Sequence, residues 1–87
     1  MNKINSYIGF AIKSKKVVYG ADNILKSKAC KLIVASQKLS SNTLEKLNTK
    51  NTQIIILPQA DYSQLNLKGL VVAITDKSLA DAIQNNL

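Results

Sequence analysis

Apolar residues along the chain gather in short runs, and these runs alternate with segments whose apolar positions recur at helical spacing. Four runs are rich in β-branched side chains, which is typical of strands; they cover residues 17–19, 31–35, 53–57 and 70–74. Gly20 ends the first run and Pro58 closes the third, and both residues commonly interrupt a strand. The pattern therefore predicts four short strands.

Helical spacing between these runs predicts five helices, over residues 5–12, 21–29, 40–48 and 61–65 and from Thr75–Asp76 to Leu87. Polar residues that often cap helices stand near several of the starts. Asn5 or Ser6 lies near the first start, Asn42 and Glu45 have the spacing of a capping box, and Asp76 caps the last helix. Asp61 and Asp81 have the character of caps or surface residues. Among the aromatic residues, we expect Phe10 in the core and Tyr62 at the surface.

Strands that alternate with helices through short connections indicate an α/β fold with helices on both faces of one central sheet. With four strands, the prediction is a three-layer α/β/α sandwich around a four-stranded mixed sheet. The 87 residues allow one modest core, so residues 1–87 are expected to form one domain.

The charge of the chain is strongly positive and unevenly distributed. Twelve lysines face five acidic residues, which gives a net charge of +7. Residues 1–50 hold ten lysines and two acids, so +8, whereas residues 51–87 hold two lysines and three acids, so −1. A basic half indicates a surface that faces a polyanion, with nucleic acid the first candidate. A membrane surface and plain solvation by lysine are the alternatives.

Several chemistries are excluded by residues that the sequence lacks. The chain contains no histidine, arginine or tryptophan, and Cys30 is its one cysteine. An internal disulfide, a cysteine metal cluster and a Cys–His pair are therefore impossible, and Cys30 is expected to be a small buried apolar residue. We expect no enzyme activity and no cofactor. No apolar run approaches a membrane span or a signal peptide, so the expected location is the cytoplasm.

Three stretches in order resemble the kink-turn RNA-binding ribosomal proteins, and among them most closely the small bacterial YlxQ-like branch. The stretches are Ile8 to Gly20 (IGFAIKSKKVVYG), Lys31 to Ser36 (KLIVAS) and Val71 to Lys77 (VVAITDK). Together the resemblance covers nearly the whole chain. It implies an α/β/α sandwich that binds structured RNA at one end of its sheet.

The resemblance also implies which residues face the RNA. A frequent motif of that family is Gly-Ala-Asn-Glu-x-x-Lys, and this chain has Gly20-Ala21-Asp22-Asn23-Ile24-Leu25-Lys26. Gly20, Ala21 and Lys26 match the motif, whereas Asp22 and Asn23 depart from it. In the family the Asn and Glu read sheared G·A pairs and the Lys meets a neighbouring acceptor. The loop before the last strand, here with Lys68 and Gly69, packs against a flipped nucleotide.

The chemistry of the same residues can be argued without the family. Gly20 lets a ligand approach the backbone because it has no Cβ, and Asn23 can both donate to and accept from a base edge. Asp22 repels phosphate, so it either accepts from a base amino group or simply caps the helix. Lys26 either meets the ligand or is a solvated surface residue. Gly20 and Gly69 could equally be ordinary turn glycines.

Lysines before and after this loop complete the candidate interface, because they make phosphate contacts that position RNA without reading its sequence. On the family's layout, Lys13, Lys15 and Lys16 are expected close to the RNA-facing end of the sheet. The full predicted set is Lys13, Lys15, Lys16, Gly20, Ala21, Asp22, Asn23, Lys26, Lys28, Lys68 and Gly69.

The function expected from these residues is a monomer that binds rRNA or another kink-turn RNA in a ribosomal or other ribonucleoprotein setting, with no membrane partner. The alternative is a protein-interaction module of the same fold that has lost kink-turn recognition, and the departures at Asp22 and Asn23 favour that alternative.

Overall fold

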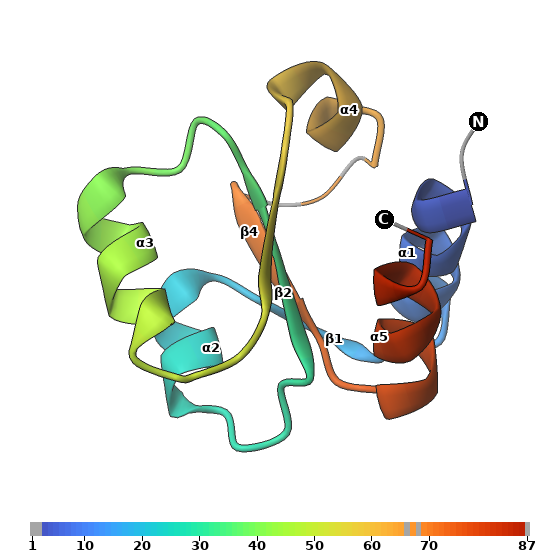
Figure 1. Ribbon diagram of the computed structural model, residues 1–87, viewed down its shortest axis with the longest axis horizontal. Helices are drawn as coiled ribbons and strands as arrows, with labels where there is room; N and C mark the ends of the chain where they lie inside the picture. Colours follow the sequence, from blue (N-terminus) through green and yellow to red (C-terminus); the bar gives the residue numbers. More distant parts are fainter. Residues whose placement is uncertain (1–2, 66, 68, 87) are drawn as a thin grey trace.

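The computed structural model describes residues 3–65, 67 and 69–86. The elements alternate along the chain as the hydrophobic pattern predicts (Figure 1). They are α1 (Lys3–Lys13), β1 (Val17–Tyr19), α2 (Ala21–Lys26), β2 (Leu32–Ser36), α3 (Ser41–Asn48), β3 (Ile54–Leu57), α4 (Gln59–Ser63), β4 (Val71–Ile74) and α5 (Lys77–Gln84).

The four strands form one mixed sheet in the order β1-β4-β2-β3. β4 runs antiparallel to both of its neighbours, and β2 pairs in parallel with β3. Helices α1 and α5 cover one face of the sheet, α2 and α3 cover the other, and α4 lies over one end (Figure 1). The predicted α/β sandwich with a four-stranded mixed sheet is confirmed.

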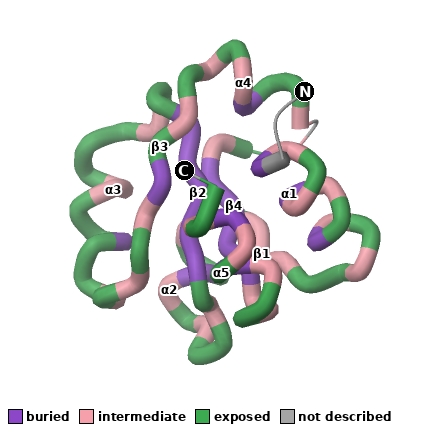
Figure 2. Tube along the Cα trace, turned by 45° about the vertical axis from the view of Figure 1, so that its right-hand side comes forward, coloured by how far each residue is buried: buried purple, intermediate pink, exposed green. Residues whose placement is uncertain are grey.

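The two central strands form the middle of the core, because every residue of β2 and β4 is buried (Figure 2). Successive side chains of a strand point to opposite faces, and the core divides accordingly. Leu32, Val34 and Val72 pack in the cluster under α1 and α5, whereas Ile33 and Ala73 pack in the cluster under α2 and α3. Burial on both faces explains why these strands read as continuous apolar runs.

Three helix starts differ from the predicted ones. α1 begins at Lys3, so Asn5 lies inside the helix rather than near its cap. α4 begins at Gln59 rather than at Asp61, which lies in its first turn. The N-cap of α3 is Ser40, whose side chain accepts a hydrogen bond from the Thr43 N–H, so the capping box expected at Asn42 is wrong. The Asp76 cap is confirmed, since its Oδ1 accepts from the Leu79 N–H at 2.9 Å. None of the described helices is long and apolar enough to cross a membrane.

The expectations for Phe10 and Tyr62 are both wrong. Phe10 is 58% exposed, and Tyr62 is 2% exposed within the cluster under α1 and α5. At 100° per residue, Phe10 stands about 200° around α1 from the buried Ile8, so helical periodicity turns its large ring to solvent. Tyr62 is buried because α4 lays it over the end of the sheet, which its short polar segment does not reveal.

The end of α2 is fixed by a lysine from a distant segment. α2 stops at Lys26 rather than at Ala29, and Ser27 leaves the helix with extended backbone. Lys50 Nζ donates hydrogen bonds to the carbonyl oxygens of Ser27 at 2.7 Å and Leu25 at 3.4 Å. Carbonyls at a helix end lack intrahelical partners, so the ammonium group replaces the missing donors.

Lys50→Met is therefore expected to lower the free energy of unfolding by about 1 kcal/mol, because the aliphatic stem survives while the donors are lost. Urea denaturation of the variant beside Lys46→Met, an exposed lysine on α3, measures the effect. Equal small losses in both variants would contradict a specific role for Lys50.

Candidate functional site

The sheet topology brings the loops of the predicted interface to one edge. β1, β2 and β3 run in the same direction and β4 runs in the opposite one, so the ends of the first three strands meet the start of the fourth. We call this the glycine edge, and it comprises residues 20–23, 37–38, 58–59 and 69–70.

Two glycines at this edge adopt backbone conformations that side chains disfavour. Gly20 has φ 86° and ψ 139°, and Gly69 has φ 72°. Both are exposed. Gly20 directly follows β1, and Gly69 lies two residues before β4, the antiparallel neighbour in which Val72 pairs with Tyr19. The structure therefore brings Gly20 and Gly69 to the same edge from distant parts of the chain. Lys68, the other residue predicted in that loop, lies outside the described residues.

Asn23 holds the turn around Gly20. Its Nδ2 donates to the carbonyl oxygen of Tyr19 at 3.0 Å, while its side chain remains exposed. One amide hydrogen and the amide oxygen are left to face a ligand. Asp22 is also exposed, but Gly20 occupies the N-cap position of α2, so the cap expected of Asp22 is wrong. Ala21 instead packs against the cluster under α2 and α3.

A polar network that sequence reasoning missed ties two strand ends together at the glycine edge. Buried Ser36 donates through Oγ to Gln59 Oε1 and accepts from the Lys38 N–H at 3.1 Å. Gln37 Oε1 accepts from the Gln59 N–H at 3.0 Å. These bonds fix the end of β2 against the start of α4, so this edge presents an ordered surface. The available signal was Ser36 itself, a polar residue that closes the apolar run of β2.

The five predicted lysines that the structure describes do not share the glycine edge. Lys13, Lys15 and Lys16 end α1 and precede β1, so they lie at the opposite edge of the sheet. Lys26 ends α2, and Lys28 lies in the connection to β2, which starts at that opposite edge. The expectation that the first three lysines lie beside the RNA-facing loop is wrong, because β1 carries the chain from one edge to the other between Lys16 and Gly20.

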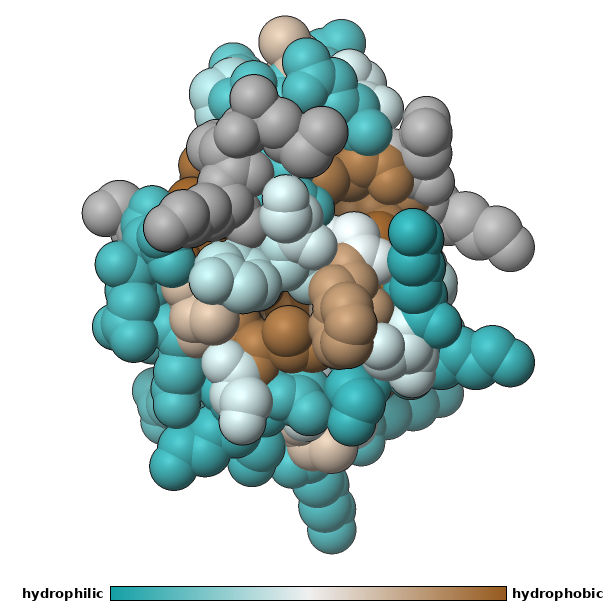
Figure 3. Space-filling model, turned by 90° about the vertical axis from the view of Figure 1, so that its right-hand side faces the viewer, coloured by the Kyte–Doolittle hydropathy of each residue, from teal (hydrophilic) through white to brown (hydrophobic). Residues whose placement is uncertain are grey.

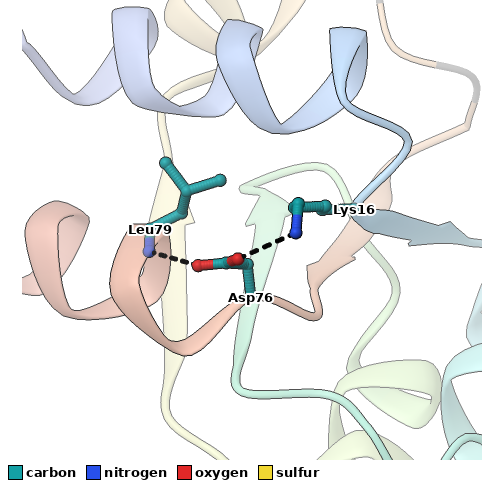
Figure 4. Close-up of polar contacts among 3 residues, drawn as sticks. All are labelled: Lys16, Asp76 and Leu79. Atoms are coloured by element: carbon teal, nitrogen blue, oxygen red, sulfur yellow. Dashed lines mark hydrogen bonds and ion pairs between the residues drawn. The ribbon is translucent and has the colours of Figure 1, made fainter.

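One of these lysines is paired. Lys16 Nζ lies 3.1 Å from Asp76 Oδ2, and the other oxygen of that carboxylate caps α5 (Figure 4). The hydrogen bond from the Leu79 N–H, followed by that from Lys16, lowers the pKa of Asp76 below its usual value. The ion pair ties the start of β1 to the start of α5, which gives Lys16 a structural role.

No family model matches the chain, and no curated protein matches its sequence. A solved structure of a Bacillus halodurans protein with unknown function is similar in fold. Its TM-score is 0.82 at 15% sequence identity, with 98% of this chain and 96% of that chain covered. The similarity extends over the whole sandwich, and at this identity it establishes the fold alone.

The described residues offer no cluster of metal ligands. They contain no group of three His, Cys, Asp or Glu side chains that could hold a metal ion. Cys30 is half-buried rather than buried as expected, and it packs against the cluster under α2 and α3. A hollow lined by Asn5, Gly9, Gln64 and Leu65 brings together no charged side chain of a described residue. The glycine edge offers exposed amide groups and open backbone.

Proposed function

We propose that the protein binds structured RNA through the glycine edge, as a non-catalytic component of a ribosomal or other ribonucleoprotein particle. A bent RNA of the kink-turn type is the expected ligand, as the resemblance of Gly20 and Ala21 to the family motif implies. Lys26, the third matching residue, lies at the other end of α2.

The observation that carries the proposal is the meeting of Gly20 and Gly69 at one ordered edge. Both are exposed at positive φ without side chains, so an RNA backbone or base could approach the main chain closely. Asn23 stands beside them with hydrogen-bonding capacity left for a base edge. The Ser36–Gln59 network keeps the surface in place without a ligand.

A protein-interaction module is the second candidate, and the local charge favours it. Among the described residues, the charged groups near the glycine edge are Lys38, Asp22 and Asp61 of α4. Two carboxylates beside one lysine attract phosphate poorly. The two candidates differ in whether a kinked RNA is preferred.

Asp22→Asn tests the proposal, with Asp81→Asn as its matched control. Both residues are exposed, and each change removes one negative charge, but Asp81 lies on α5, away from the glycine edge. A unit charge about 4 Å from a phosphate is worth about 1 kcal/mol in water. We therefore expect Asp22→Asn to tighten binding of a bulge-kinked RNA with sheared G·A pairs about fivefold, and Asp81→Asn to change it less than twofold.

Gel-shift titrations against the kinked RNA and a straight duplex of equal length, at one salt concentration, decide between the candidates. A preference for the kinked RNA in the wild type, strengthened in Asp22→Asn alone, supports the proposal. Equal affinity for both RNAs in all three proteins would contradict it and leave the interaction module.

A further inference from the structure

The whole net charge of the protein resides at the edge opposite the glycine edge. We call this the lysine edge, and it comprises the segments that flank the starts of β1, β2 and β3 and the end of β4, namely residues 13–16, 26–31, 49–53 and 75–77. These segments hold eight lysines and Asp76, which gives +7. The rest of the chain holds four lysines and four acids, which gives zero.

Backbone hydrogen bonds bind these segments into one surface. The Lys31 N–H donates to the Ile74 carbonyl at 2.8 Å, and the Thr75 N–H donates to the Lys16 carbonyl at 2.9 Å. Lys50 joins the third segment to the second through Ser27. The lysines come from both helix layers and converge at this end of the sheet.

Most of these lysines have no structural partner among the described residues. Lys16 pairs with Asp76, and Lys50 binds two carbonyls. The other six have exposed side chains with no ion pair or hydrogen bond to a described residue: Lys13, Lys15, Lys26, Lys28, Lys31 and Lys77. Six ammonium groups that repel one another lower stability, so folding alone does not explain their gathering.

Helix dipoles account for little of this charge. Lys13 and Lys26 stand in the last turns of α1 and α2, where a cation is favourable. Each helix end carries about half a unit charge. Three helices end at the lysine edge and α5 begins there, so the dipoles sum to roughly −1 against +7.

We propose that the lysine edge is a second RNA-binding surface that grips the phosphodiester backbone of an RNA segment separate from the one at the glycine edge. Lysines act as flexible point charges, so this surface positions backbone rather than reading sequence. The two edges lie at opposite ends of the strands, so one protein bridges two RNA segments. The bridging rests on the proposed function, whereas the lysine contact does not.

An exposed aromatic ring favours RNA over an anionic membrane as the partner. Phe10 lies one helical turn before Lys13 on α1, and an unpaired base can stack on such a ring beside the cations. Membrane insertion needs a continuous apolar face, and the apolar stripe of α1 packs into the core instead. Figure 3, which views the face formed by α1 and α5, shows hydrophilic side chains along its lower rim.

Two double variants, each of which removes two positive charges, test the contact between the lysine edge and an RNA backbone. Lys28→Gln with Lys31→Gln removes two charges from the lysine edge, and Lys3→Gln with Lys46→Gln removes two from α1 and α3, outside both edges. The side chains of Lys28, Lys31 and Lys46 are exposed. Binding of a straight RNA duplex is titrated by fluorescence anisotropy across a range of salt concentrations.

We expect the Lys28/Lys31 variant to bind the duplex about tenfold more weakly, with a salt slope shallower by about 1.8, since each phosphate contact contributes about 0.9. The Lys3/Lys46 variant should retain the wild-type slope. Equal losses in both variants would overturn the proposal in favour of diffuse polyanion binding. A loss in the Lys3/Lys46 variant alone would overturn it while leaving RNA binding at the glycine edge intact.

Native mass spectrometry with an excess of the short kinked RNA tests the bridging. Wild type should carry two RNA molecules and the Lys28/Lys31 variant one. If only one RNA binds wild type, bridging is refuted. If the Asp22→Asn change also leaves kinked-RNA binding unaltered, the proposed function fails separately.

Sedimentation with phosphatidylserine vesicles tests a membrane as the partner of the lysine edge. Tighter binding to vesicles than to RNA at matched charge, lost in the Lys28/Lys31 variant, would assign the edge to a membrane instead.

Discussion

Gly20→Ala is expected to lower the free energy of unfolding by about 1–3 kcal/mol, whereas Gly9→Ala is expected to raise it by about 0.5–1 kcal/mol. The same added methyl group thus lowers the free energy of unfolding at one position and raises it at the other. The reason lies in the backbone and not in crowding, because a Cβ at Gly20 would meet the Asn23 Nδ2 at 3.8 Å, an ordinary contact.

At φ 86° and ψ 139°, Gly20 occupies a region of backbone space that is almost restricted to glycine. Alanine there must strain or move the turn that joins β1 to α2. Gly9 lies within α1, and no atom lies within 4 Å of a Cβ built on it. Alanine at that position removes conformational freedom from the unfolded chain and suits the helix.

Thermal and urea denaturation of both variants beside wild type measure the two effects. A destabilised Gly9→Ala protein would show that α1 is not helical at that residue. A Gly20→Ala protein of wild-type stability would contradict the conformation of Gly20, and the argument for a binding surface at the glycine edge with it. Combining the two changes offsets part of the stability that Gly20→Ala loses.

The fold was predictable because the two central strands stand out in the sequence as apolar runs without helical spacing. β2 and β4 are buried on both faces, so each reads as an unbroken run of apolar residues bounded by polar ones. The order of strands in the sheet was not predictable in the same way. β4 lies between β1 and β2 through pairings across long separations, such as Leu32 with Ile74, and local patterns do not record these.

Single residues were mispredicted where local geometry competes with side-chain size or type. Phe10 is large and apolar, yet its angular position on α1 exposes it. Asn42 has the capping-box spacing to Glu45, yet Ser40 starts the helix earlier and caps it. The candidate site shows the same limit, because the lysines before β1 and the glycine after it are neighbours in sequence. β1 places them at opposite edges, and only the register of the sheet reveals this.

Tyr62→Phe is expected to stabilise the protein at neutral pH by about 1 kcal/mol or more. The Tyr62 hydroxyl is buried and has no hydrogen-bond partner among the described residues. An unsatisfied buried donor costs free energy that the phenyl ring avoids, while the ring keeps its packing in the cluster under α1 and α5. Tyr7→Phe, at a half-buried position, is the control and should change stability by less than about 0.5 kcal/mol.

The same variant should also resist alkali better than wild type. Burial, followed by the nearby Tyr19, raises the pKa of Tyr62 from 10.0 to about 12. The folded protein therefore keeps this proton where the unfolded chain has lost it, so Tyr62 ionisation leaves the stability of wild type unchanged below pH 10 and lowers it as pH rises from 10 to 12. Lysine deprotonation affects both proteins alike, so the difference between their unfolding free energies from pH 9 to 12 isolates Tyr62.

This difference in unfolding free energy should grow in favour of Tyr62→Phe over that range. A constant difference would show that Tyr62 ionises equally in the folded and unfolded states, and a destabilised variant at pH 7 would show that its hydroxyl is hydrogen-bonded after all.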